Sequence, residues 1–146
     1  PSRKPIKTIL PEKLKVALNI QPKEVYKSRD YLLVYENQED IIDIKINRSK
    51  FDKINLGTGG VIFTAPAEEF DFVSRFFTPK STILEDPVTG SSHCSLIPFW
   101  SQFLNKNKLE AKQISARGGY LLCENKGNRV IIGGQAILFS SGYFNI

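Results

Sequence analysis

The stretch EDPVTGSSH, residues 85–93, decides the fold of the 146-residue chain, because it leads from a strand-like segment into the best helix of the sequence. It combines two carboxylates, a rigid proline, a glycine and three hydroxyls. The start of a helix exposes unpaired backbone N–H groups and the positive end of the helix dipole. Gly90 permits close approach of the backbone, and Ser91 and Ser92 add hydroxyl donors. The stretch therefore predicts an anion site suited to a carboxylate or a phosphate.

A purely structural role for the same residues stays open. Thr89, Ser91 or Ser92 would then cap the helix. Asp86 would close an Asx-turn before Pro87. On the residues alone, this simpler interpretation is favoured over the anion site.

The only histidine and one of the two cysteines follow at once. His93 is a candidate general base, but a lone histidine in an apolar helix is more often a packed core residue. Cys94 lies where a helix N-terminus favours a thiolate, yet the neighbouring Leu96 and Ile97 indicate burial. Cys94 and Cys123 lack CxxC spacing, which argues against a zinc site and predicts two reduced thiols in a cytoplasmic protein. A single disulfide bridge stays open.

The hydrophobic pattern predicts one α+β domain over residues 1–146, with a long helix against a curved or barrel-like sheet. Helices are expected at 11–20, around Phe51 and at 91–105. Strands are expected at 31–35, 42–46, 61–64, 70–77, 109–114, 120–124, 129–132 and 136–139. Pro98 lies inside the longest helix, where it should remove one backbone hydrogen bond and kink the helix.

Composition narrows the function classes. Hydrophobic residues make up 41% of the chain, too many for a disordered protein, and no apolar run reaches the roughly 20 residues of a membrane helix. Lys and Arg number 20 against 15 Asp and Glu, giving a net charge of +5. This balance leaves a nucleic-acid-binding domain as one open alternative. Because the basic residues are scattered among acids and carry no recognition motif, a solvated face is favoured.

Two further clusters are candidate parts of a pocket. Arg117 is suited to clamp a carboxylate, and Gly118 and Gly119 permit positive φ and close approach, although a surface turn explains them equally well. Residues 133–134 resemble a strand bulge that would place Gln135 at a pocket, with a structural role favoured. Neither glycine pair forms a dinucleotide or Walker loop, so nothing indicates a nucleotide cofactor.

Four motifs occur in an order typical of one family: SRFFTP at 74–79, EDPVTGSSH at 85–93, Gln113 with RGG at 117–119, and GQA at 134–136. From about Gly60 onward the sequence resembles the second half of the PhzF (phenazine-biosynthesis-like) family, which shares the diaminopimelate epimerase fold. The resemblance implies two similar lobes, each with a curved, mainly antiparallel sheet around a central helix. This chain would be the C-terminal lobe, and residues 136–146 would pair with the missing N-terminal lobe.

The resemblance also implies an isomerase or epimerase that transfers a proton on a small carboxylate-bearing metabolite without metal or cofactor. Asp86 would polarise the substrate. The residues implied to bind it are Gly90, Ser91, Ser92, Arg117 and Gly118. The family's acid/base Glu and a His belong to motifs of the first half that this sequence lacks, so the chain alone is expected to be inactive.

The expected partners are a small carboxylate substrate and the missing N-terminal lobe, with a homodimer as an open alternative. Neither nucleic acid nor a membrane is expected as a partner. The alternative function is a non-catalytic small-molecule binding or interaction module of the same fold.

Overall fold

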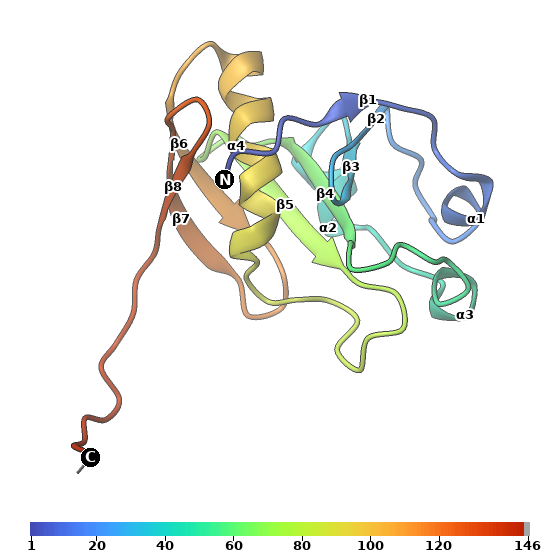
Figure 1. The fold of residues 1–146 in the computed structure, drawn as a ribbon. Coiled ribbons are helices and arrows are strands. Elements are labelled where there is room, and N and C mark those ends of the chain that lie inside the picture. Colours follow the sequence, from blue (N-terminus) through green and yellow to red (C-terminus); the bar gives the residue numbers. More distant parts are fainter. Residues whose placement is uncertain (145–146) are drawn as a thin grey trace.

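Eight strands form one mixed sheet in chain order (Figure 1). The computed structural model describes residues 1–144. The strands are β1 (Ile6–Lys7), β2 (Glu24–Lys27), β3 (Tyr31–Val34), β4 (Val61–Pro66), β5 (Phe72–Phe77), β6 (Lys108–Gln113), β7 (Gly119–Asn125) and β8 (Val130–Gly133). The pairs β3–β4 and β5–β6 are parallel and the other neighbours antiparallel. The expected α+β class with a mainly antiparallel sheet is confirmed, and the sheet is open, with β1 and β8 at its edges.

The helices cover opposite faces of this sheet. Parallel strands need crossover connections, and here the β3–β4 crossover contains α2 and α3 whereas the β5–β6 crossover contains α4. The helices are α1 (Glu12–Lys15), α2 (Gln38–Ile42), α3 (Arg48–Phe51) and α4 (Gly90–Leu104). One apolar core lies between the sheet and α1 to α3, and the other between the sheet and α4. The central strands are therefore buried on both sides.

Strand β4 shows how the sequence builds both cores. Successive side chains of a strand point to opposite faces, so a strand buried on both faces reads as a continuous apolar run. Val61 and Phe63 pack into the core under α1 to α3, whereas Ile62 packs under α4. The sequence-predicted strand at 61–64 is confirmed and extends to Pro66.

Trp100 fixes helix α4 on the sheet. Its ring stacks on Phe72 with centroids 5.6 Å apart. Its indole Nε1 donates a hydrogen bond to Thr64 Oγ1 at 2.9 Å, which satisfies the only polar atom of the side chain in the core. The direction of α4, and hence the position of its N-terminus, follows from this contact.

Helix α4 continues through Pro98 as one element. Proline has no N–H, so the carbonyl of Cys94, four residues earlier, loses its helical partner. The backbone N–H of Arg3 donates to this carbonyl at 2.8 Å. The N-terminal arm, residues 1–5, thus supplies the hydrogen bond that the proline removes.

Two predicted strands are wrong. Over 42–46, Ile42 ends α2, because the Asn37 side chain accepts from the Asp40 N–H at 2.9 Å and starts a helix just before the predicted strand. Residues 136–139 belong to an exposed segment without regular structure that runs away from the sheet (Figure 1). A strand needs a partner, and no described strand lies beside this segment. Its pairing with another lobe stays a prediction, and residues 145–146 lie outside the described part.

Candidate functional site

The loop before α4 is tied to β5 by an ion pair between two of the motifs. Arg75 donates to both carboxylate oxygens of Glu85, at 2.7 and 2.9 Å. The same guanidinium donates to the carbonyls of Ile41 and Ile44 near the end of α2. The Asp86 N–H donates to Phe76 O at 3.0 Å. These bonds explain why SRFF and EDP occur together, since one motif holds the other in place.

Gln113, at the end of β6, holds the loop from the other side. It is fully buried. Its Oε1 accepts from the Thr89 N–H at 2.8 Å, and its Nε2 donates to Asp86 O at 2.7 Å and to Thr89 Oγ1 at 3.1 Å. One amide side chain therefore satisfies buried backbone groups at both ends of the 86–89 loop.

The N-terminus of α4 has no side-chain cap. Thr89 occupies the N-cap position, but its hydroxyl donates to Asp86 Oδ2 at 2.8 Å instead of accepting from the helix. Ser92 is buried and its hydroxyl donates back to Thr89 O at 2.8 Å. Within residues 1–144, no group accepts a hydrogen bond from the Gly90 or Ser91 N–H. The expected capping role is thus not performed by the residue in the cap position.

A pocket of about 540 Å³ adjoins this helix start. The three clusters singled out in the sequence meet here. Its lining includes Gly90, Arg117, Gly118, Gly134 and Gln135. Arg117 is exposed and, among the described residues, forms no ion pair or hydrogen bond through its side chain. A cation thus borders a pocket that is also lined by Gly90, whose backbone amide is unpaired.

The glycine pair at 118–119 allows β7 to begin against the motif loop. Gly118 has φ of +71°, which favours glycine. A Cβ on Gly119 would lie 2.4 Å from Val88 Cγ2, so no side chain fits there without displacing the loop. Ser115 completes the attachment by donating to Pro87 O at 2.6 Å.

The remaining candidates lie around the helix start without lining the pocket. Asp86 is half-buried and contacts Thr89 Oγ1. The exposed Ser91 hydroxyl accepts from Arg29 Nη2 at 3.0 Å. Ser92 can offer only its backbone N–H, because its hydroxyl is used inside the helix.

His93 is a core residue. It is fully buried, and its Nδ1 lies 2.8 Å from Thr89 O, so Nδ1 carries the proton that the carbonyl accepts. Burial lowers the pKa of the imidazole to about 4, against the opposing hydrogen bond to Thr89 O, and the ring is neutral at neutral pH. Cys94 and Cys123 are both free thiols, so the bridge left open by the sequence is not formed.

Sequence reasoning missed Arg29 and Asp30 as parts of this region. Arg29 lies 62 residues before Ser91, and no local pattern links the two positions. Arg29 also forms an ion pair with the fully buried Asp30, with Nη2 and Oδ2 2.9 Å apart. The burial of Asp30, which makes Arg29 its countercharge, is visible only in the structure.

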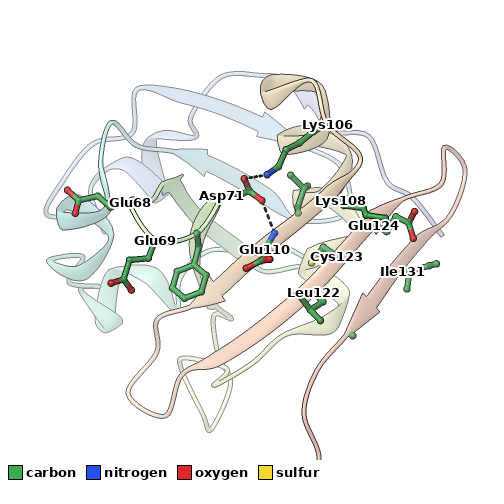
Figure 2. A pocket seen from close by; sticks show the side chains of 13 residues that line it. Glu68, Glu69, Asp71, Lys106, Lys108, Glu110, Leu122, Cys123, Glu124 and Ile131 are labelled. Atoms are coloured by element: carbon green, nitrogen blue, oxygen red, sulfur yellow. Dashed lines mark hydrogen bonds and ion pairs between the residues drawn. The ribbon is translucent and has the colours of Figure 1, made fainter.

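A second, larger pocket of about 610 Å³ lies on the face of β6 to β8 that is turned away from α4 (Figure 2). Asp71 pairs with Lys106 and accepts from the Glu110 N–H at 2.7 Å. Glu110 in turn accepts from Tyr120 OH at 2.8 Å. Two of its acids, Asp71 and Glu110, therefore already have partners within the chain. The described residues bring no three His, Cys, Asp or Glu side chains together for a metal ion.

No helix within residues 1–144 is both long and apolar enough to cross a bilayer.

Comparisons with known proteins cover nearly the whole chain. An uncharacterized isomerase of Pseudomonas aeruginosa is 41% identical over 146 residues, covering 100% of this chain and 56% of the relative. One from Halalkalibacterium halodurans is 40% identical over 141 residues, covering 94% and 52%. The crystal structure of a PhzF family protein from Enterococcus faecalis matches with a TM-score of 0.88 at 44% identity, over 96% of this chain and 54% of that one.

The chain spans about half the length of these relatives. The sequence signature of the phenazine biosynthesis-like family, PhzC-PhzF, matches residues 4–142. This range contains the whole eight-stranded sheet, helix α4 and the pocket beside it. The chain therefore belongs to the phenazine biosynthesis-like protein family.

Proposed function

We propose that this chain supplies the anion-holding half of an isomerase site, in which a proton is moved on a small carboxylate-bearing metabolite without a cofactor. The observation that carries the proposal is the uncapped start of α4, where Thr89 donates to Asp86 and leaves the first helix amides unpaired beside a pocket. Membership of a family with isomerases among its relatives supports the reaction class.

The residues have distinct roles in this proposal. The Gly90 and Ser92 amides and the Ser91 hydroxyl bind the substrate carboxylate, and the helix dipole favours its charge. Arg117 and the Gly118 backbone border the same pocket and bind a second polar end of the substrate. Donors fixed in advance stabilise the charge that develops when a proton leaves a carbon next to a carboxylate.

Asp86 polarises the substrate rather than transferring the proton. Its carboxylate is held in place by the Thr89 hydroxyl. Within the described residues, Arg117 and Tyr120 are the only titratable side chains that line the pocket, and neither suits a general base at neutral pH. The acid/base Glu therefore belongs to an opposing lobe, as the resemblance implies. By the same reasoning, the isolated chain binds anions but is inactive as an isomerase.

The reaction class is tested by solvent deuterium incorporation, because moving a proton through an exchanging base labels the substrate carbon. The chain is assayed alone, and also completed with the part of the P. aeruginosa relative that lies outside the match. A panel of small chiral amino and hydroxy acids in D2O is followed by proton NMR. We expect exchange by the completed protein only. Equal exchange by the chain alone would contradict the split site.

The residue roles are tested in the completed protein with Asp86→Asn and Ser91→Ala. Each should lower the exchange rate more than tenfold, which is the effect of roughly 1.4 kcal/mol. The free energy of unfolding, measured by thermal unfolding, should fall by only about 1 kcal/mol, which is the usual effect of removing a helix-capping side chain. Glu124→Gln, which lines only the larger pocket and pairs with the exposed Lys126, is the matched control and should leave the rate unchanged. A melting shift without kinetic loss would assign these residues a structural role only.

A non-catalytic binding module is the second candidate. The same unpaired amides and Arg117 would serve it, and the lack of a base among the described pocket residues favours it for the chain on its own. It predicts saturable anion binding with no exchange in the completed protein.

A further inference from the structure

The loop between β2 and β3 contacts one face of α4. Ser28 Oγ lies 2.7 Å from Ser95 Oγ, and Arg29 Nη2 donates to Ser91 Oγ at 3.0 Å. Ser91 and Ser95 are four residues apart, so they lie one turn apart on the same side of the helix. The loop therefore places a guanidinium beside the first turn of α4.

Arg29 is held rigidly by the residue that follows it. Its Nε lies 3.1 Å from both carboxylate oxygens of Asp30, and Nη2 lies 2.9 Å from Oδ2. The Asp30 side chain is 0% exposed, so Arg29 is the countercharge that a buried carboxylate requires. Asp30 Oδ1 also accepts from the Gly60 N–H at 2.8 Å.

Gly60 must be glycine for this arrangement. A Cβ there would lie 2.4 Å from Phe76 Cζ and 2.8 Å from Phe77 O, so a side chain would push the backbone and its N–H away from Asp30. A chain of contacts thus runs from Gly60 through Asp30 and Arg29 to Ser91. The turn at 57–60 fixes the cation at the helix start.

The direction of the hydrogen bond has a chemical consequence. A guanidinium only donates, so Ser91 Oγ is the acceptor from Arg29 and its own proton must point elsewhere. Ser91 is exposed, and among the described residues its hydroxyl donates to no other group. A hydroxyl that accepts from a cation is also a stronger donor, because hydrogen-bond chains polarise one another.

From this geometry we propose that Arg29 is a positioning residue for the anion site. It orients the Ser91 hydroxyl as a donor to the substrate carboxylate, and it acts on the substrate only through Ser91. The inference rests on the proposed function, because it presumes that the helix start binds the substrate. It adds a specificity-determining residue from the opposite end of the sheet to those that line the pocket.

The test is a double-mutant cycle on the 146-residue chain, with acetate as the probe and the Gly90 and Ser91 amide NMR shifts as the readout. Arg29→Gln and Ser91→Ala should each weaken acetate binding by about tenfold, the scale of one charge-assisted hydrogen bond. The double variant should be no weaker than either single variant, because Arg29 acts through Ser91. Arg48→Gln, which removes a cation paired with Asp52 elsewhere, should bind as the wild type does.

Arg29→Lys separates positioning from structure. A lysine ammonium restores the countercharge for Asp30 but lacks the planar fork that reaches two partners at once. We expect near wild-type unfolding with the weak binding of Arg29→Gln. Wild-type binding in both Arg29 variants, or additive losses in the double variant, would overturn the role of Arg29 while leaving the site in place. Absence of acetate binding by the wild-type chain would overturn the proposed anion site, and this inference with it.

Discussion

The pocket at the start of α4 and the pocket on the outer face of β6 to β8 differ in how their polar groups are satisfied. The larger one, on the outer face of β6 to β8, is rich in charge, but Asp71 and Glu110 are already bonded to neighbours (Figure 2). The smaller one, at the start of α4, exposes an unpaired cation and unpaired helix amides. Lys108 in the larger pocket and Arg117 in the smaller one are both unpaired cations among the described residues, so the unpaired Gly90 amide at the helix start is what distinguishes the smaller pocket.

The difference has a geometric origin. On a sheet, side chains of adjacent strands lie within reach of one another, so polar residues such as Glu110 and Tyr120 pair across strands. A helix start leaves its first N–H groups without partners in its own chain. The sequence then determines whether a side chain caps them, and here Thr89 is bonded to Asp86 instead.

The largest effect is expected from Gln113→Leu, which removes the hydrogen bonds that hold the 86–89 loop beside the smaller pocket. The variant leaves the Thr89 N–H and the Asp86 carbonyl without partners, at roughly 2 kcal/mol each, so the free energy of unfolding should fall by about 4 kcal/mol. Urea unfolding measures this loss. A fall below about 1 kcal/mol would show that water replaces the glutamine and that the loop is not rigidly held.

Acid should destabilise the protein through His93. The unfolded chain takes up a proton as the pH falls through about 6.5, whereas the folded chain does so only near 4. Stability should therefore fall as the pH drops through this window, by up to about 3 kcal/mol. Asparagine at position 93 can donate a similar bond without titrating, so His93→Asn should lose this slope. Unfolding curves from pH 4 to 7 compare the two proteins, and equal slopes would contradict the burial of a neutral ring.

Gly119→Ala tests the contact between the β6–β7 loop and the motif. The new methyl would clash with Val88, and overpacking of this kind costs about 2 kcal/mol. Gly90→Ala is the matched control, since a Cβ there meets nothing within 4 Å. The double variant Gly119→Ala with Val88→Ala should recover most of the loss in thermal unfolding. Equal effects at positions 90 and 119 would mean that the loop yields freely.

The smallest effect belongs to the outer pocket. Glu124→Gln removes one side of an exposed pair with Lys126, which should change the free energy of unfolding by less than about 0.5 kcal/mol. It should also leave acetate binding at the Gly90 amide unchanged, since the two pockets do not share this residue. A loss of acetate affinity would show that the two faces are coupled.

The strong elements could be predicted because their signal is local. The apolar run of β4 and the stripe of α4 are set by their own residues, and both are confirmed. Strands β1 and β2 escaped prediction because they are short and lie at or near the sheet edge, where partners rather than pattern decide. The run at 42–46 was misread because the Asn37 cap outweighed the β propensity of its isoleucines.

The residues of the candidate site likewise fall into those with a local sequence signal and those placed only by tertiary contacts. The glycine pairs and the EDPVTGS loop carry their own backbone signal, so the sequence could place them near a pocket. Gln113 was singled out as part of a cluster, but its bonds to Thr89 and Asp86 depend on which strand lies beside the loop. Arg29 reaches Ser91 only after the sheet has formed, so nothing in its neighbourhood could reveal the contact.

The hydrogen bond from the Arg3 N–H to the Cys94 carbonyl predicts a sequence pattern among relatives of this chain. Wherever a relative keeps proline at the position of Pro98, an amide from outside the helix must supply the missing donor, and the arm before β1 is the segment that reaches it here. Wherever another residue replaces the proline, its own backbone N–H can donate to the carbonyl four residues earlier, and the hydrogen bond from the arm is no longer needed. Since the donor is a backbone N–H, any residue except proline can serve at position 3, so relatives with proline at position 98 should lack proline at position 3.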